Sequence, residues 1–226
     1  GAKTPTALTE SMVAGYNKES ITDQNLTITY TDTDTNSATN GQNFTANLKV
    51  TLNDKVTAIT ITAPTKTKYN HGDSLDLTGS KIKVTTKSGK EKDVALTSSM
   101  ITEADGSTVN MSPDSTKYGS DNTLNKVLKI TYTEDGKTVT ENYTITIVND
   151  VKSISIQTPA KTTYNVNDTL DISQGEILVT RATGTPTVIA MTDSRVNVTG
   201  FDSNTEHTDL PLTVTFTENG VSKTTT

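Results

Sequence analysis

The sequence predicts an all-β fold, on the strength of three observations: its composition, an alternation of apolar residues with period two, and a repeat of about 95 residues. The chain has 226 residues, of which 31% are hydrophobic and 4% aromatic, and it contains no Trp. Thr is the commonest residue, and its β-branched side chain favours extended backbone while its hydroxyl suits a solvated sheet face. This composition indicates small cores covered by polar surface.

The repeat orders the predicted elements. Four segments recur 95 residues later without a gap: Val56–Ile61 as Val151–Ile156, Pro64–Tyr69 as Pro159–Tyr164, Asp73–Leu77 as Asp168–Ile172, and Ile82–Val84 as Ile177–Val179. A partial third copy comes first, because Ser11–Val13 matches Ser99–Ile101 and Leu26–Tyr30 matches both Leu128–Tyr132 and Leu212–Phe216. Leu48, Val50 and Leu52 match Tyr143, Ile145 and Ile147. Such internal periodicity is typical of repeat architectures.

Each matched segment alternates apolar and polar residues, which predicts antiparallel strands with one buried face. The strands expected from this pattern are centred on Ile59/Ile61, Leu75/Leu77, Ile82/Val84, Leu128/Ile130/Tyr132 and Tyr143/Ile145/Ile147. Turn residues separate them at Lys87–Lys90, Glu134–Lys137 and Glu218–Gly220. About seven short strands in 95 residues predict a β-sandwich of the immunoglobulin type, with Tyr30, Tyr132 and Tyr143 in the cores.

The repeated string Ile-x-Ile, Pro-x-Lys-x-x-Tyr, Asp-x-Leu-Asp-Leu/Ile and Ile-x-Val resembles the bacterial immunoglobulin-like domains of group 3. The Gly-Phe-Asp at residues 200–202 is also similar to that family. One departure is Asn167, at a position where the family often has Gly and where Gly72 stands in the earlier copy. The resemblance implies tandem sandwiches in a Gram-positive cell-surface protein, and it brings no catalytic residues.

We therefore expect tandem immunoglobulin-like antiparallel β-sandwiches in three segments. The N-terminal segment (1–54) corresponds to the C-terminal half of a module, and the middle segment (55–150) to a complete module. The C-terminal segment (151–226) is expected to lack its last strand, since the counterpart of Tyr143–Ile147 falls past Thr226. An edge beside Leu212, Val214 and Phe216 would then be open to strand addition by another copy of the chain.

The junctions at Leu52–Val56 and Val148–Val151 contain neither Gly nor Pro and almost no linker. We expect each module to have its neighbours in the same chain as partners, in a semi-rigid row.

Charge and composition exclude several classes of function. The formal net charge of −6 argues against nucleic-acid partners, which require clustered Lys and Arg. No apolar run approaches the roughly 20 residues of a membrane span. The absence of Cys removes disulfides and thiol chemistry, and it is compatible with an extracellular location.

Enzymatic activity is not expected, and the sequence predicts no catalytic residue and no cofactor. The two histidines are His71 and His207. His71 precedes Asp73 and Ser74, which imitates a catalytic triad. The matching residues Asp168 and Thr169 recur without a His, so a shared scaffold motif explains them better.

No metal site is predicted either. Asp32–Asn36 imitates the start of a calcium loop, but Ser37 replaces the required Gly and Asn43 the bidentate Glu, so a polar hairpin loop is the better interpretation. A calcium ion held by Asp54 and Asp150 at the junctions is a weaker alternative.

The predicted function is a structural spacer or stalk in an extracellular protein of the bacterial surface. One alternative is an adhesin whose loops bind a host protein or a glycan, for which Tyr16 and Tyr118 in variable loops are the candidates. The other is an accessory module of a secreted polysaccharide-degrading enzyme.

Overall fold

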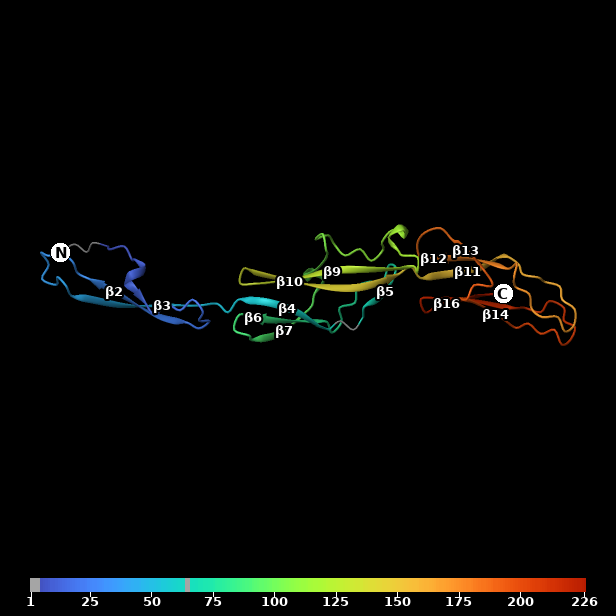
Figure 1. Cartoon of the computed structure of the whole chain (residues 1–226), viewed down its shortest axis with the longest axis horizontal. Coiled ribbons are helices and arrows are strands. Elements are labelled where there is room, and N and C mark those ends of the chain that lie inside the picture. Colours follow the sequence, from blue (N-terminus) through green and yellow to red (C-terminus); the bar gives the residue numbers. More distant parts are fainter. Residues whose placement is uncertain (1–4, 64–65) are drawn as a thin grey trace. The chain divides into compact units, whose positions relative to one another are not determined.

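The structure, a computed structural model, describes residues 5–63 and 66–226 and is all-β, as the sequence predicts (Figure 1). Pro64 and Thr65 of the repeated string lie outside the described residues. Within these ranges, no helix has the length and apolar character needed to cross a membrane.

The chain divides into two compact units. The first contains Gly1–Thr62, Lys81–Ala95 and Thr131–Glu141, and the second contains Ala63–Ser80, Leu96–Ile130 and Asn142–Thr226. Because this division cuts through the middle segment, the boundaries between the three segments stay a prediction.

The N-terminal segment, in the first unit, forms an antiparallel sheet of order β1-β2-β3. The 3₁₀ turn η1 (Glu10–Met12) leads into β1 (Val13–Ala14), which is followed by β2 (Gln24–Thr31) and β3 (Asn43–Val50). Leu26 is buried, but Tyr30, Phe44 and Leu48 are exposed. The prediction that Tyr30 is buried is therefore wrong, because at the Tyr30 end of β2 this face of the sheet stays uncovered in the described part of the chain.

The other sheet of the first unit has the order β4-β6-β7, with β4 (Val56–Ala63), β6 (Lys81–Thr86) and β7 (Glu91–Ala95). Ile59, Ile82 and Val84 are buried. Lys92 of β7 forms an ion pair with Glu134, at the tip of the β9–β10 hairpin that belongs to the same unit.

A sheet of order β5-β10-β9-β8 contributes most of its residues to the second unit. It consists of β5 (Lys68–Asn70), β8 (Ile101–Glu103), β9 (Thr123–Glu134) and β10 (Lys137–Val148), and the 3₁₀ turns η2 (Ser98–Met100) and η3 (Ser115–Lys117) lie between β7 and β9. Strand β5 runs parallel to β10, while β8 is antiparallel to β9. Asp135 and Gly136 join β9 to β10 with φ of 47° and 72°, as a type I′ hairpin turn requires.

The C-terminal segment, also in the second unit, is a sandwich of two antiparallel three-stranded sheets. The first sheet contains β11 (Val151–Thr158), β12 (Glu176–Arg181) and β13 (Thr187–Ala190), and the second contains β14 (Val196–Thr199), β15 (Thr213–Glu218) and β16 (Val221–Thr225). Both sheets contribute to one core, in which Ile177 and Val179 of β12 pack in a cluster with Val214 and Phe216 of β15. The fold class predicted from the alternating pattern is thus confirmed.

Two predictions about strands need correction. Leu75/Leu77 belong to no strand, and neither do Leu170/Ile172. At both places a tyrosine hydroxyl, described below, forms hydrogen bonds with the backbone where a neighbouring strand was expected.

The last strand, predicted to be missing from the C-terminal segment, is partly present. Strand β16 pairs with β15 from Val214↔Thr225 to Glu218↔Val221. The Asn219-Gly220 turn, with φ of 53° and 85°, closes this hairpin. The edge of β15 beside Val214 and Phe216 is therefore covered within the chain.

Candidate functional site

The structure does not build a catalytic triad around His71. Nδ1 of His71 lies 2.8 Å from the Tyr118 hydroxyl, and the His71 amide donates to the Val148 carbonyl (2.8 Å). The Asp73 carboxylate instead accepts a hydrogen bond from the Asn70 amide (2.9 Å) and lies 3.5 Å from Nζ of Lys66. Asp73 therefore supports its own turn and does not orient the imidazole.

The Asp73 contacts belong to an arrangement that recurs in the next copy. The Asp168 carboxylate accepts from the Asn165 amide (2.8 Å) and lies 3.6 Å from Nζ of Lys161. Each lysine also lies over the ring of the tyrosine three residues later, at 4.6 Å in both copies. The interpretation of Asp73 as part of a scaffold motif agrees with this recurrence.

The hydroxyl groups of the same tyrosines form hydrogen bonds with the backbone seven residues later in the chain. The Tyr69 hydroxyl donates to the Asp76 carbonyl (3.2 Å) and accepts from the Asp76 amide (3.3 Å). Tyr164 makes the same pair of bonds with Asp171, at 3.0 and 3.1 Å. Because the hydroxyl satisfies both backbone groups of this Asp, the residue between the two apolar positions has its hydrogen bonds without a strand partner.

Position 167 shows how one departure from the family pattern is accommodated. Gly72 and Asn167 both have positive φ, of 83° and 68°, and their amides donate to Met111 and Ser203 carbonyls respectively. Asn is one of the few residues that tolerate this left-handed backbone. The turn is therefore preserved.

His207 forms only a surface contact. Its Nε2 lies 3.0 Å from Oγ1 of Thr205 and 3.7 Å from the Asp202 carboxylate, and both ionisable side chains are substantially exposed.

The acidic loop at residues 32–36 is a hairpin loop between β2 and β3, as the sequence indicates. Asp32 accepts hydrogen bonds from the Asp34 amide (3.0 Å) and from Oγ1 of Thr39 (2.6 Å), and Asp34 accepts from the Asn36 amide (2.9 Å). The hydrogen bond from Thr39 is the main cause that lowers the pKa of Asp32. In the part of the chain that the structure describes, no three His, Asp or Glu side chains gather into a metal site.

The junction residues cap the loops of the strands that follow them. Asp54 accepts hydrogen bonds from the amide (3.0 Å) and hydroxyl (2.6 Å) of Ser88 and from the Thr86 hydroxyl (2.8 Å). The bond from the Ser88 hydroxyl is the main cause that lowers the pKa of Asp54. The Lys87 amide donates to the Lys55 carbonyl (2.9 Å), so the β6–β7 loop is fixed to the junction.

The same cap forms 95 residues later, where Asn149 replaces Asp54. The Asn149 side chain accepts from the Thr183 amide (3.0 Å) and donates to the Thr183 carbonyl (3.1 Å). The Ala182 amide donates to the Asp150 carbonyl (2.9 Å), which repeats the bond between Lys87 and Lys55. The cap is thus a second arrangement shared by the two copies.

The two junctions nevertheless differ in length and burial. Between β3 and β4 lie residues 51–55, which are exposed or only partly buried. Between β10 and β11 lie only Asn149 and Asp150, which are 5% and 8% exposed. Asp150 pairs with Nζ of Lys152 at 2.9 Å. The near-absence of a linker therefore holds for the second junction, and the first is longer than the sequence suggested.

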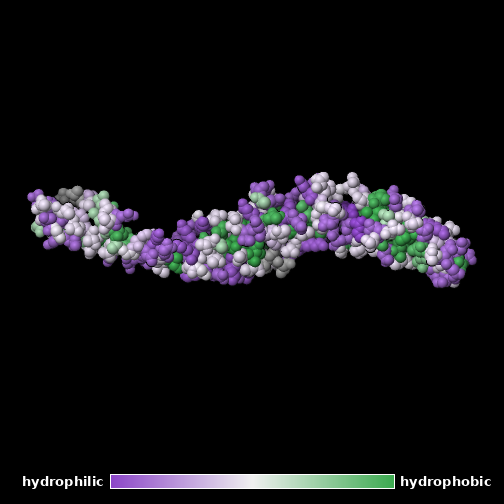
Figure 2. Space-filling model, viewed as in Figure 1, coloured by the Kyte–Doolittle hydropathy of each residue, from purple (hydrophilic) through white to green (hydrophobic). Residues whose placement is uncertain are grey.

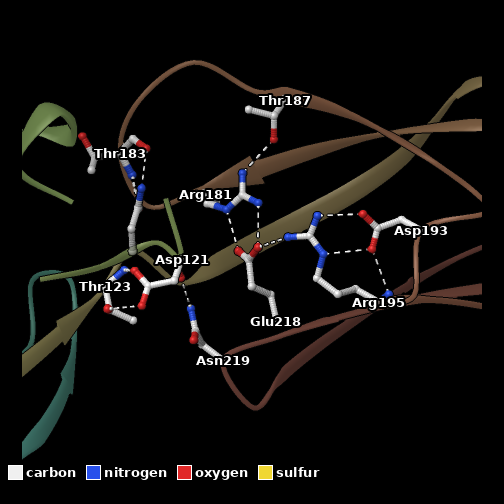
Figure 3. A network of polar contacts seen from close by, with 10 residues as sticks. Asp121, Thr123, Arg181, Thr183, Thr187, Asp193, Arg195, Glu218 and Asn219 are labelled. Atoms are coloured by element: carbon white, nitrogen blue, oxygen red, sulfur yellow. Dashed lines mark hydrogen bonds and ion pairs between the residues drawn. The ribbon is translucent and has the colours of Figure 1, made fainter. Parts of the chain in front are cut away.

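Further contacts cross the second junction. The Asn219 side chain donates to the Asp121 carbonyl at 2.9 Å (Figure 3). Nζ of Lys68 donates to the Asn219 carbonyl at 3.2 Å. A Cβ added to Gly184 would lie 3.1 Å from Cβ of Ser115, so these loops are in close contact. The Asn149 amide also donates to the Asn122 carbonyl (2.9 Å).

A buried ionic network lies beside this junction (Figure 3). Glu218 of β15 is placed between two guanidinium groups: Arg181 donates through Nε (2.7 Å) and Nη2 (3.0 Å), and Arg195 through Nη1 (2.6 Å). Arg195 also binds Asp193, and its hydrogen bonds lower the pKa of Asp193 to about 2. Because Arg181 is on β12 and Glu218 on β15, the network joins the two sheets of the C-terminal segment.

Sequence reasoning missed this network. A signal was available, since Arg181 and Arg195 are the only two arginines in the chain and both lie in the same copy. Arginine is the residue suited to a buried bidentate contact with a carboxylate.

The two tyrosines considered for glycan binding have different environments. Tyr16 is 60% exposed. Tyr118 is partly buried and bound to His71, and burial, with the charge of Asp150 as a second cause, raises its pKa to about 12. Tyr118 therefore does not offer an open ring, whereas Tyr16 does.

Comparison with protein families gives a match over part of the chain. Residues 157–226 match the family of bacterial Ig-like domains (group 3). Domains of this family are typically non-catalytic, are usually extracellular, and suggest a structural module of a surface protein. No curated protein matches the chain.

Proposed function

We propose that the chain is a spacer segment of an extracellular bacterial surface protein, in which copies of one sandwich module follow each other in tandem. The observation that carries the proposal is the second junction. Its only two residues between strands are buried polar residues, and the Asn149 side chain is bonded to the next copy's loop.

This junction is suited to transmit orientation from one module to the next. Modules in one chain are by default free to move relative to each other unless their contact is extensive or specific. Here Asn149, Asn219 and Lys68 supply hydrogen bonds across the junction. Each such bond contributes about 0.5–1.5 kcal/mol, and several together restrict bending.

The tandem arrangement is supported by contacts that recur at the offset of the sequence repeat. Two contacts recur 95 residues apart: the tyrosine hydroxyl bond to Asp76 and to Asp171, and the loop cap by Asp54 and by Asn149. Shared hydrogen bonds of this kind indicate one folding unit used more than once.

The test measures the width of a distance distribution across the junction. Because the chain lacks Cys, Thr144→Cys and Ser155→Cys, both at exposed positions, introduce two spin labels without background. Pulsed electron paramagnetic resonance should give a narrow distribution. Asn149→Ala should broaden it, while Asn204→Ala, which removes only a local bond to Asp202, should leave it unchanged. A broad distribution in the unmutated chain would contradict the spacer function.

An adhesive role is the second candidate, and the exposed Tyr16 ring favours it. Loop aromatic rings of this kind stack on sugars or fill pockets of partner proteins. A glycan array with the unmutated chain and with Tyr16→Ser distinguishes a direct ligand contact from a passive spacer.

A further inference from the structure

The turn between β15 and β16 carries a contact that crosses the second junction. Nδ2 of Asn219 donates a hydrogen bond to the Asp121 carbonyl (2.9 Å), and the Asn219 backbone carbonyl accepts one from Nζ of Lys68 (3.2 Å). Both partners belong to the middle segment. Gly220 follows in the sequence, so the residue that makes this contact is the first member of an Asn-Gly pair.

An Asn-Gly pair loses its side-chain amide without an enzyme, by deamidation. The Gly220 backbone nitrogen attacks Cγ of Asn219, and the bond from Cγ to Nδ2 breaks. The departing group takes up the proton of the Gly220 amide and leaves as ammonia. Water then opens the cyclic imide and gives either aspartate or isoaspartate, in which the main chain contains one more methylene. Glycine favours the attack because it has no Cβ to obstruct the approach.

The surroundings of Gly220 leave its backbone nitrogen accessible. Gly220 is exposed, and a Cβ added to it would meet nothing within 4 Å. Within residues 5–63 and 66–226, its amide donates no backbone hydrogen bond. Hydrophilic residues cover much of the visible surface where the middle and C-terminal segments meet (Figure 2). Water therefore reaches the turn and supplies the second step.

The chain contains one other Asn-Gly pair, Asn40-Gly41, in the loop between β2 and β3. There the Gly41 amide donates to the Asp32 carbonyl (2.7 Å), while the Asp32 amide donates to Gln42 (3.0 Å) and its carboxylate accepts from Thr39 (2.6 Å). The attacking nitrogen is freed only when several of these bonds break together. Asn40-Gly41 is therefore an internal reference that should react more slowly.

The aspartate product keeps the turn but loses the contact across the junction. The matching turn of the middle segment is Asp135-Gly136, whose φ angles of 47° and 72° are close to the 53° and 85° of the Asn-Gly pair. An aspartate is thus compatible with this hairpin. Its carboxylate is only an acceptor, so it has no proton to donate to the Asp121 carbonyl. An exposed ion pair with Lys68 contributes little in exchange.

We propose that Asn219 is a site of spontaneous deamidation and that its conversion permanently loosens the second junction. The inference rests on the proposed spacer function, because loosening has a consequence only where the junction is stiff beforehand. The bond from Asn219 to Asp121 has to break before Gly220 attacks, so each opening of the junction promotes the reaction. Bending of the spacer is thereby converted into a lasting chemical change.

The first test follows the chemical step by mass. The full chain is incubated in mildly alkaline buffer, digested, and analysed by mass spectrometry for the replacement of –NH2 by –OH at each Asn. Asn219 should convert several-fold faster than Asn40. In Asn149→Ala, which removes another pair of bonds across the junction, Asn219 should convert faster still, while the rate at Asn40 stays unchanged.

The second test measures the effect of the product on the junction. Asn219→Asp reproduces the aspartate product in the chain that carries spin labels at positions 144 and 155. Loss of one hydrogen bond lowers the equilibrium constant for the closed junction about fivefold, so the distance distribution should broaden. Asp135→Asn makes the reverse exchange in the matching turn, which belongs to the other compact unit, and it should leave the distribution unchanged.

Three results would overturn the proposal. Asn219 could stay intact while Asn40 converts, Asn149→Ala could leave the rate at Asn219 unchanged, or Asn219→Asp could leave the distance distribution as narrow as before. Each of these is compatible with a stiff spacer and refutes the modification alone. A broad distribution in the unmutated chain would instead contradict the spacer function, and with it the loosening.

Discussion

Replacing Glu218 by Gln tests whether the buried network holds the two sheets of the C-terminal segment together. Glu218 is 7% exposed and accepts three hydrogen bonds from two guanidinium groups. Gln has nearly the same shape, but it carries no charge and turns an amide group toward donors. The substitution therefore leaves the arginines without their shared counter-ion.

The two arginines do not contribute equally to the expected loss. The Arg181 side chain is 8% exposed, and without Glu218 its remaining side-chain partner is Thr187 (2.7 Å). Arg195 is 37% exposed and keeps its contact with Asp193, so water and that carboxylate compensate for most of its loss. Removing one partner of a buried pair costs about 3–5 kcal/mol. We expect the lower end of that range, set by Arg181.

Hydrogen exchange of β12 and β15 measures this loss in the C-terminal segment alone. A loss of about 3 kcal/mol accelerates exchange of the best-protected amides about 150-fold. Glu91→Gln, which removes the exposed pair with Lys83, is the matched control; the exchange of its own strands, β6 and β7, should change little, because an exposed ion pair contributes little to stability.

The double variant Arg181→Met with Glu218→Leu separates charge from packing. Replacing a buried ion pair by apolar residues is often neutral or stabilising, so most of the protection should return. The reasoning fails if Glu218→Gln has the small effect of Glu91→Gln, or if the double variant is less stable than the single one.

Two further predictions concern packing and alkaline pH. Gly175→Ala should destabilise the C-terminal segment by about 1–3 kcal/mol, because the added Cβ would overlap Sδ of Met191. Thermal unfolding measures this loss, and Gln174→Ala, at an exposed neighbouring position, is the control. Burial raises the pKa values of Tyr118 and Tyr143 from 10.0 to about 12. The stability linked to these two groups is fully present below pH 10 and is lost as the pH rises toward 12, because in that range only the unfolded chain releases their protons. Denaturant unfolding between pH 9 and 12 should show that decline, and Tyr143→Phe should reduce it.

The alternation of apolar residues predicted most strands because burial on one face determines them. Ile82/Val84 and Leu128/Ile130 are in strands and fully buried or nearly so. Leu75/Leu77 show the same alternation without a strand, since the Tyr69 hydroxyl satisfies the Asp76 backbone. Local periodicity does not reveal a partner that comes from a side chain.

The repeat predicted shared positions better than it predicted burial or contacts across the junction. Tyr30 and Tyr132 match in sequence and were both predicted to lie in cores, but Tyr30 is exposed and Tyr132 is only partly buried. Burial depends on a second sheet that the pattern around these residues does not encode. The bonds of Asn219 to Asp121 and Lys68 join residues far apart in the sequence, and the repeat offers no second instance of them. They required the three-dimensional structure.

The cap at positions 54 and 149 shows how copies of one module can diverge. Asp54 and Asn149 both accept a hydrogen bond from the amide 34 residues later, at 3.0 Å in each case. The second hydrogen bond of the side chain differs: the Asp54 carboxylate accepts from the Ser88 hydroxyl, whereas the Asn149 amide donates to the Thr183 carbonyl. An acid can thus be exchanged for its amide while the backbone keeps its path. Selection is then free to adjust the ionic character of each module separately, without redesigning the scaffold that bears it.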